Sequence, residues 1–198
     1  MRTYIIRIMA IIVLLGSIGT DNAKAQARID TIFANMPDSL LPYLTRNNRL
    51  DCIDFIQNNM KAEVENLFGT KSELVVLTDD YLQLRLNSIT TLEMKLLKSG
   101  GRDSVVCLSK TILSPEPCSE LTFFDTRWNA MNVGFKLDKI ADLIGKSDYI
   151  MHEARLSKDD ETVTINMRRI FSKDRELTGD TVKTLKYRWN GTTLEQEL

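Results

Sequence analysis

The chain has 198 residues, and its 26 Lys and Arg against 27 Asp and Glu give a formal net charge of −1 at pH 7. Because a nucleic-acid-binding surface needs an excess of basic residues, this balance argues against DNA or RNA as a partner. Hydrophobic residues make up 43% of the sequence, which is enough for a folded core and argues against a largely disordered chain.

The first 25 residues have the three parts of a secretory signal peptide. Two arginines near the start precede an apolar run, Ile8–Ile18, which is too short to cross a bilayer, since that needs roughly 20 residues. Residues 23–25 then read Ala-Lys-Ala, the small-x-small pattern that signal peptidase cleaves. We therefore expect cleavage near Gln26 and a periplasmic or secreted protein with no membrane span. The alternative is an uncleaved N-terminal membrane anchor.

The start of the mature chain has helical patterns. Residues 28–36 predict a short helix that the following proline ends. A longer helix is predicted over 48–68, with Thr45 or Asn47 as its N-cap and Gly69 as its stop.

The longer predicted helix is amphipathic. Six apolar residues recur at the helical period and are expected to be buried: Leu50, Ile53, Ile56, Met60, Val64 and Leu67. A separate stripe is expected to face water: Asp51, Asp54, Asn58, Lys61 and Glu65. A third side suggests a second contact and consists of Cys52, Phe55 and Ala62.

From Glu73 onward apolar residues alternate with polar ones, as in antiparallel strands. Strands are predicted over 74–77, 82–86, 92–96, 104–113, 121–128, 149–156, 162–171, 181–189 and 192–195, and a short helix over 137–144. Asn190-Gly191 predicts a two-residue hairpin turn. The fold class that follows is α+β, a single domain of residues 26–198 with N-terminal helices packed on an antiparallel meander sheet.

Two stretches of the chain look duplicated. Residues 105–113 lead to a strand that ends Arg-Trp-Asn at 127–129, and residues 163–171 lead to a strand that ends Arg-Trp-Asn at 188–190. One interpretation is an internal repeat of two related helix-plus-meander halves, residues 26–133 and 134–198. The other is a chance similarity of two hairpins, and the sequence does not decide between them.

Three cysteines, Cys52, Cys107 and Cys118, remain in the exported chain. Cys107 and Cys118 are candidates for a disulfide across a hairpin, but an odd count leaves at least one thiol over. Three buried, inert thiols are the favoured interpretation. Because no Cys-x-x-Cys pair occurs, the pattern does not predict redox or zinc chemistry.

The titratable residues do not form a recognisable catalytic or metal-binding pattern. His152 lies in a predicted strand beside Glu153, with no nucleophile motif nearby. Asp51 and Asp54 stand one helical turn apart and are expected to be solvated. The acidic groups at 79–80 and 159–161 have the composition of turns and lack the glycine and alternating ligands of a calcium loop. No catalytic residue, cofactor site or metal site is predicted.

Four aromatic residues in predicted strands are candidates for a surface that stacks on a sugar or a peptide: Trp128, Trp189, Tyr187 and Phe124. Strand aromatics more often pack in the core, which is the favoured interpretation. The preferred function is a non-enzymatic envelope module that binds a protein, a peptide or a glycan. The rival is a periplasmic hydrolase that uses a carboxylate pair with His152, since catalytic groups need to be adjacent only in space.

Several segments together resemble an uncharacterised family of small exported proteins from Bacteroidales. The resemblance is carried by residues 36–45 (MPDSLLPYLT), 48–51 (NRLD), 54–55, 60–62, 77–81 (LTDDY) and 123–125 (FFD). It implies an envelope location and brings no activity, because the family is a domain of unknown function. It also implies that Asp-Ser or Asp-Thr followed by an aliphatic residue, at 30, 38, 103 and 180, is a candidate O-glycosylation site.

Overall fold

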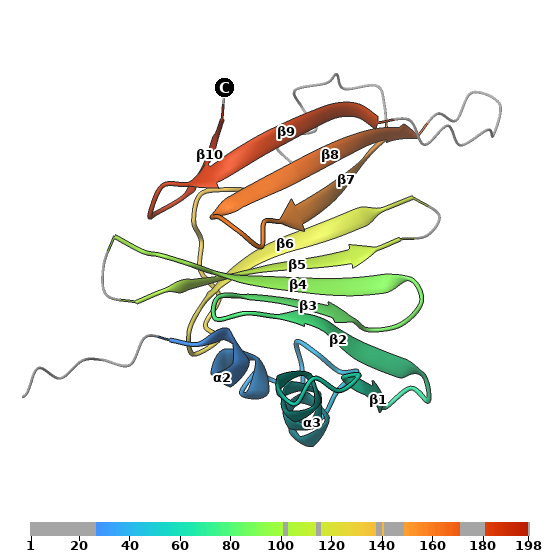
Figure 1. The fold of residues 1–198 in the computed structure, drawn as a ribbon. Helices are drawn as coiled ribbons and strands as arrows, with labels where there is room; N and C mark the ends of the chain where they lie inside the picture. The colour runs from blue at the N-terminus through green and yellow to red at the C-terminus, as the bar shows by residue number, and fades with distance from the viewer. Residues whose placement is uncertain are drawn as a thin grey trace, which may run out of the picture.

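The fold is taken from a computed structural model that describes residues 27–100, 103–113, 116–137, 140, 149–170 and 181–197. The predicted signal peptide and most of the predicted helix at 137–144 lie outside the described residues. Two helices, a six-stranded sheet and a four-stranded sheet lie in succession along the molecule (Figure 1). The predicted α+β class is therefore correct.

Both N-terminal helices form, but the second is shorter than predicted. Helix α2 spans Ile29–Ala34 and α3 spans Arg46–Gln57. The hydroxyl of Thr45 accepts a hydrogen bond from the Asn48 backbone N–H, and the Asn48 side chain accepts one from the Thr45 N–H, which confirms Thr45 as the cap. After α3, Asn59 adopts a φ of 57°, and the chain reverses into strand β1, Glu63–Glu65. The predicted extension to residue 68 is wrong.

The predicted buried face of this helix is also partly wrong. Met60 and Leu67 lie beyond the end of α3 and are 55% and 64% exposed, and Leu50 is exposed as well. The buried residues of α3 are Arg49, Cys52 and Ile53. The helix therefore turns the side that bears Arg49, Cys52 and Ile53 toward the core, and Met60, Val64 and Leu67 of the predicted stripe lie beyond its end at Gln57.

The six-stranded sheet is an antiparallel meander in the order β1 to β6. After β1, its strands are β2 (Lys71–Leu77), β3 (Tyr81–Arg85), β4 (Thr90–Leu97), β5 (Val105–Ile112) and β6 (Cys118–Asp125). Its alternating residues point to two different cores. One face packs on the helices, through residues such as Leu82, Leu92, Met94 and Val106. The other face packs on the second sheet.

The second sheet has the order β10-β9-β8-β7 and is also antiparallel. Its strands are β7 (Tyr149–Leu156), β8 (Thr162–Ile170), β9 (Thr181–Trp189) and β10 (Leu194–Gln196). Trp189 pairs with Leu194, so the last hairpin has a loop of residues 190–193 and not the predicted two-residue turn. The Asn190 side chain closes this loop by accepting from the backbone N–H groups of Thr192 and Thr193.

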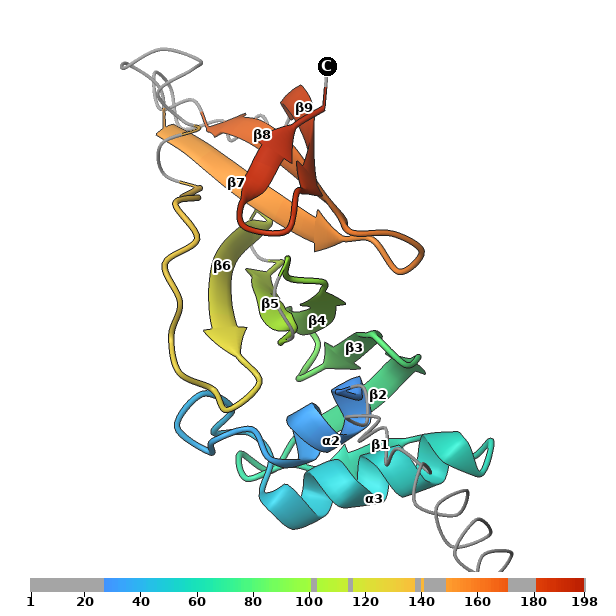
Figure 2. The same cartoon turned by 90° about the vertical axis from the view of Figure 1, so that its left-hand side faces the viewer.

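The three layers are seen from the side in Figure 2, with the helices at one end and the second sheet at the other. The segment after β6 runs back alongside this strand before the chain enters β7 (Figure 2). Its backbone joins the strand through the Met131 N–H, which donates to the Phe123 carbonyl at 2.8 Å, and through a bridge between Phe124 and Ala130.

The two tryptophans of the predicted repeat differ in local geometry. Trp128 follows β6 with a φ of 68° and joins the core beneath the helices, whereas Trp189 lies within β9 and joins the core between the sheets. The hairpins β5–β6 and β8–β9 belong to sheets of six and four strands. The internal repeat stays a prediction.

All three cysteines are free thiols. Cys107 lies opposite Phe123 and Cys118 opposite Ile112, at the far ends of the same strand pair. At about 3.3 Å per residue this separates them by roughly 17 Å, too far for a disulfide. Cys52 and Cys107 are buried as expected, and Cys118 is half-buried.

Candidate functional site

The structure places the acidic residues singled out in the sequence in separate, ordinary surroundings. Asp51 and Asp54 are exposed on α3, as predicted, and Asp54 contacts Asn58, the C-cap residue of this helix. Asp80 pairs with Lys95 at 2.9 Å beside the β2–β3 turn. In the β7–β8 turn, hydrogen bonds from the hydroxyls of Thr162 and Ser157 hold the pKa of Asp160 at about 2.

His152 and Glu153 do not share a face of the second sheet. They are successive residues of β7, so their side chains point to opposite faces. His152 shares its face with Ala154 and Leu156, which lie in the core between the sheets. Adjacency in the sequence therefore does not create an acid–base pair here.

The aromatic candidates belong to the core, in line with the favoured interpretation. Phe124 packs against Trp128 with ring centroids 5.4 Å apart, beneath the helices. Trp189 stacks on Phe123 at 6.2 Å between the sheets, and its indole N–H donates to the Lys98 carbonyl. These residues do not form an exposed stacking surface.

A buried carboxylate, Glu93 of β4, lies between the two sheets and is only 4% exposed. One of its oxygens accepts from the Tyr81 hydroxyl at 3.0 Å, and the other from the Leu156 N–H of β7 at 3.2 Å. Burial raises the pKa of Glu93, although the Leu156 N–H, the Tyr81 hydroxyl and the nearby Arg155 partly offset this. The pKa of Tyr81 is raised as well, by its own burial and then by the negative charge of Glu93.

Two serines on the same face of the first sheet also bind the edge of β7. The Ser109 hydroxyl donates to the Ala154 carbonyl at 2.7 Å, and the Ala154 N–H donates to the Ser119 hydroxyl at 2.9 Å. Because β7 is the end strand of its sheet, its outward backbone groups have no strand partner there. Glu93, Ser109 and Ser119 supply the missing partners, so their acid and hydroxyl groups serve as structural contacts.

Charged residues of the second sheet surround this contact. Arg155 binds Glu153 at 2.6 Å and reaches Glu93 at 3.9 Å. Arg168 lies 3.9 Å from both Glu153 and Glu116. Each of these two arginines lies near two carboxylates and compensates their negative charge. This arrangement favours a salt-bridge network over a free acid–base dyad.

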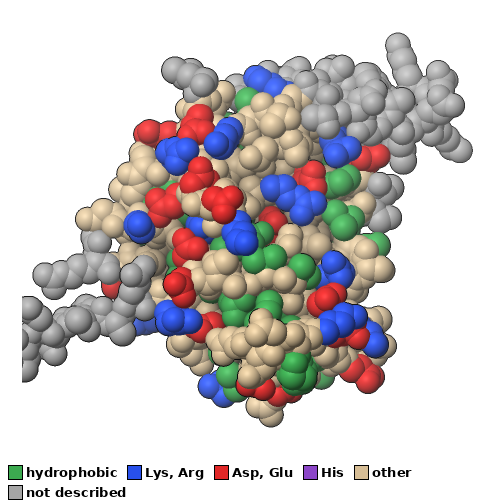
Figure 3. Space-filling model, viewed as in Figure 1, with side chains coloured by type: hydrophobic (Ala, Val, Ile, Leu, Met, Phe, Trp, Pro, Cys, Tyr) green, Lys and Arg blue, Asp and Glu red, His purple; other side chains and the backbone are tan. Residues whose placement is uncertain are grey.

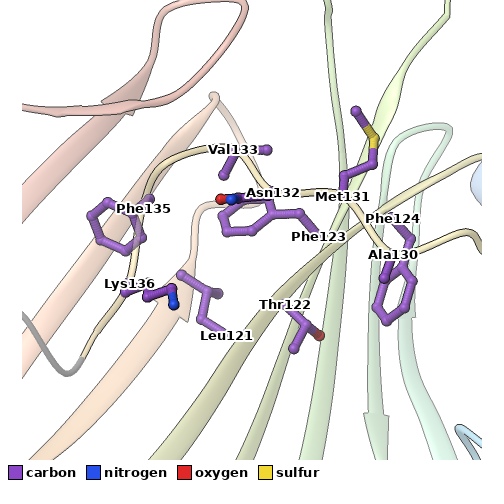
Figure 4. A pocket seen from close by; sticks show the side chains of 10 residues that line it. All are labelled: Leu121, Thr122, Phe123, Phe124, Ala130, Met131, Asn132, Val133, Phe135 and Lys136. Carbon is purple, nitrogen blue, oxygen red and sulfur yellow. The ribbon is translucent and has the colours of Figure 1, made fainter.

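An open pocket of about 410 Å³ lies between β6 and the segment that follows it (Figure 4). We call it the β6 pocket. Its apolar wall consists mainly of Leu121, Phe123, Met131, Val133 and Phe135. Three polar side chains complete the lining: Thr122, Asn132 and Lys136.

Local contacts explain why the β6 pocket is formed. The Asp125 carboxylate accepts from the backbone N–H groups of Arg127 and Asn129, which closes the turn after β6 and returns the chain along the strand. Further along, Phe135 packs edge-on against Tyr187 of the second sheet, with ring centroids 5.0 Å apart. The returning segment is thus anchored at both ends, and the pocket lies between the anchors. Its volume is within the range of small-ligand sites.

Sequence reasoning missed both the pocket and the buried polar residues. The strand 92–97 carries Glu93 and Lys95 at alternate positions, which predicts a solvated face. Both are in fact buried, and Lys95 donates to the Lys158 carbonyl of the β7–β8 turn. Two charges inside an otherwise apolar run were the available signal that a second layer covers this face.

Two other kinds of site are absent from the described part of the chain. In the described part of the chain, no three or more His, Cys, Asp and Glu side chains are grouped as a metal ion would need. None of the described helices has the length and apolar character needed to cross a membrane.

The comparisons with known proteins give a family and a similar fold. A family model described as "Protein of unknown function (DUF3256)" matches residues 22–192. A solved structure, a domain of an uncharacterized protein from Porphyromonas gingivalis W83, matches with a TM-score of 0.67 and 18% identity, over 88% of this chain and 100% of that one. At this identity the likeness shows the fold alone. No curated protein matches the sequence.

Proposed function

Since the chain belongs to the DUF3256 family, whose function is unknown, we propose a function from its geometry: a non-enzymatic module that binds an apolar ligand in the β6 pocket. The observation that carries this proposal is the chemistry of the pocket lining. Six of its ten lining residues, the five of the apolar wall and Phe124, have large apolar or aromatic side chains, and Thr122, Asn132 and Lys136 add polar groups to the lining. A peptide with a large apolar side chain is the simplest ligand of this type in a bacterial envelope.

The polar groups between the sheets support binding over hydrolysis. A nucleophile or general base needs a free lone pair directed at a substrate. Ser109 and Ser119 instead bind the Ala154 backbone, and Glu93 binds the Leu156 N–H. These groups hold the second sheet in place and do not line the β6 pocket.

The pocket is tested with two methionines that serve as matched reporters. Met131 lines the pocket and Met60 does not, and both are exposed. In protein with ¹³C-labelled methionine methyls, the fluorophore 1-anilinonaphthalene-8-sulfonate, which joins apolar aromatic rings to an anionic sulfonate, is expected to shift the Met131 resonance and leave Met60 unchanged. Leu121→Glu places a charge in the apolar wall and is expected to weaken this binding at least tenfold. Equal shifts at both methionines would show non-specific adsorption and contradict the proposal.

We further propose that the protein acts in the periplasm or outside the cell after cleavage near Gln26. The support is the order of a basic start, an apolar run and Ala-Lys-Ala in the first 25 residues. Mass spectrometry of the protein from its natural host is expected to find an N-terminus at or near Gln26. An intact Met1 form retained in the inner membrane would contradict this location.

A further inference from the structure

One end of the first sheet carries an exposed apolar surface. At this end β1 turns into β2, β3 into β4 and β5 into β6 (Figure 1). Leu67 and Phe68, in the first of these turns, are 64% and 62% exposed. Ile89 in the second turn and Ile112 at the end of β5 are 44% and 45% exposed. We call these four residues the apolar end patch.

Contacts between the turns show that the patch residues stand on one edge of the sheet. The Phe68 ring packs edge-on against Tyr43 at 4.9 Å, and the Tyr43 hydroxyl contacts the Asn87 amide of the next turn at 3.4 Å. The Leu113 N–H donates to the Ile89 carbonyl at 2.7 Å, which joins that turn to the end of β5. The apolar side chains therefore stand on neighbouring turns of one sheet edge and not on separate parts of the surface.

The turn that presents Leu67 and Phe68 is rigidly held by Asn66, which is itself buried. Asn66 accepts from the backbone N–H groups of Phe68 and Thr70, and its amide donates to the Leu86 carbonyl of the next turn. The N–H of Leu67 donates to the Tyr43 carbonyl, and that of Gly69 to the Asn66 carbonyl. Backbone donors across this turn are thus satisfied inside the protein. That removes the main cost of placing a turn in an apolar medium.

The charges around the patch are few and balanced. Residues 66–70 and 86–90 contain no charged side chain. The charges nearest the first turn are two acidic residues of β1, Glu63 and exposed Glu65, and two lysines that flank this strand, and Glu63 binds both Lys61 and Lys71 at 2.6 Å. Over the face seen in Figure 3, basic and acidic side chains are likewise interspersed. This surface therefore offers no excess of one charge that would attract a strongly charged partner.

We propose that the apolar end patch docks the protein on the surface of a zwitterionic lipid bilayer, with Leu67 and Phe68 inserted at the boundary between headgroups and acyl chains. A turn that protrudes, carries large apolar side chains and has its backbone donors satisfied meets the requirements of that boundary. The balanced flanking charge selects uncharged or zwitterionic headgroups over anionic ones. Docking is independent of the β6 pocket, which lies along a different edge of the first sheet.

The test uses the processed protein, as released from the envelope, and vesicles of phosphatidylethanolamine and phosphatidylcholine. Wild-type protein is expected to co-sediment with the vesicles, and raising the NaCl concentration from about 50 to 500 mM is expected to change the partition less than about twofold, because charge plays little part. The double variant Leu67→Ser, Phe68→Ser is expected to lower the partition coefficient at least about tenfold. The control is Val75→Ser, which removes an exposed apolar side chain of β2 and is expected to leave the partition within about twofold.

A second measurement reports insertion directly. Brominated lipids are expected to quench the added fluorescence of Phe68→Trp and not that of Val75→Trp. Vesicle binding that is unchanged in the double variant, or a Trp at position 68 that is not quenched, overturns the proposal. Wild-type protein that self-associates through the patch, with loss of association in the double variant and no vesicle binding, also overturns it and assigns the patch to a second copy of the chain.

Discussion

The guanidinium of Arg49, on α3, holds the segment between the two helices in place. It donates to the backbone carbonyls of Met36 at 2.7 Å and Leu44 at 2.6 Å, and to the Asp38 carboxylate at 2.9 Å. The side chain is almost fully buried. The hydrogen bonds of this one side chain therefore join residues 36–45 to residues 48–51, and both segments carry the resemblance to the uncharacterised family.

Replacing Arg49 with Ala is expected to lower the free energy of unfolding by about 3 kcal/mol or more, because buried carbonyls then lose their donor and no water replaces it. Urea denaturation followed by circular dichroism measures the change. The matched control is Arg46→Ala, three residues earlier on the same helix and exposed, with an expected change under about 0.5 kcal/mol. Similar losses in the two variants would show that Arg49 does not hold the segment.

The thiols offer a second prediction for single residues. Burial raises the pKa of Cys52 to about 11 and also raises that of Cys107, so both are expected to react slowly with Ellman's reagent at pH 8. Cys118 is half-buried and is expected to be the one fast thiol. The variant Cys118→Ser should abolish the fast phase, and the denatured wild type should release three equivalents. One equivalent from the denatured protein would instead show that two of the three cysteines are joined in a disulfide.

Among the elements, the strands were predicted well and the second helix was not. A strand such as Tyr149–Leu156 is identified by local alternation and by the turn residues that follow it, and both signals are contained in a few residues. Beyond Gln57 the apolar residues Met60, Val64 and Leu67 continue the helical period by coincidence. Tertiary pairing decides this segment, because Val64 pairs with Ser72 in β1–β2 and Asn59 takes a left-handed conformation. Strand pairing of this kind cannot be deduced from the spacing of apolar residues alone.

The shortened helix changes the expected effect of mutations on it. Ile53→Ala deletes a buried side chain and is expected to cost about 2–5 kcal/mol of unfolding free energy. Met60→Ala is expected to cost less than about 0.5 kcal/mol, since Met60 lies past the helix and is exposed. Asp54→Ala is expected to stay similarly small, because Asp54 contacts only solvent and Asn58. Urea melts compare the three variants. A loss of unfolding free energy in Met60→Ala equal to that in Ile53→Ala would support the longer helix that the sequence predicts.

At the scale of the whole molecule, the candidate site and the contact between the sheets lay beyond sequence reasoning for one physical reason. Both depend on which surfaces meet after the elements have formed. Residues 130–136 have no strong periodicity, and they become a pocket wall only because the turn closed by Asp125 returns them along β6. Glu93 and Ser109 look like solvent-facing positions of amphipathic strands until β7 crosses above them. The spacing of apolar residues along the chain identifies the helices and strands of each layer. Which residues lie between two layers becomes clear only once the three-dimensional packing of the layers is known.

The contact between the sheets predicts how stability depends on pH. Around Glu93 the facing groups are Tyr81 of β3, Cys107 of β5, and Arg155 with the Leu156 N–H of β7. Burial raises the pKa of Glu93 above its ordinary value of 4.5, so the folded protein binds this proton more tightly than the unfolded chain. The contribution of protonated Glu93 to the free energy of unfolding is therefore fully present below about pH 4.5, and it is lost as the pH rises through the pKa of Glu93 in the folded protein.

Glu93→Gln keeps the shape of the side chain and removes its titration. The unfolding free energy of the wild type, relative to Glu93→Gln, is consequently expected to fall as the pH is raised from about 4 to 7. Urea melts of both proteins across this range measure the difference, with Glu65→Gln on exposed β1 as the control whose difference stays flat. A wild-type advantage that grows with pH would mean that the ionised carboxylate is the stabilising form. In that case the donors from Tyr81, Leu156 and Arg155 outweigh burial, and the two sheets are held together by a charge and not by a proton.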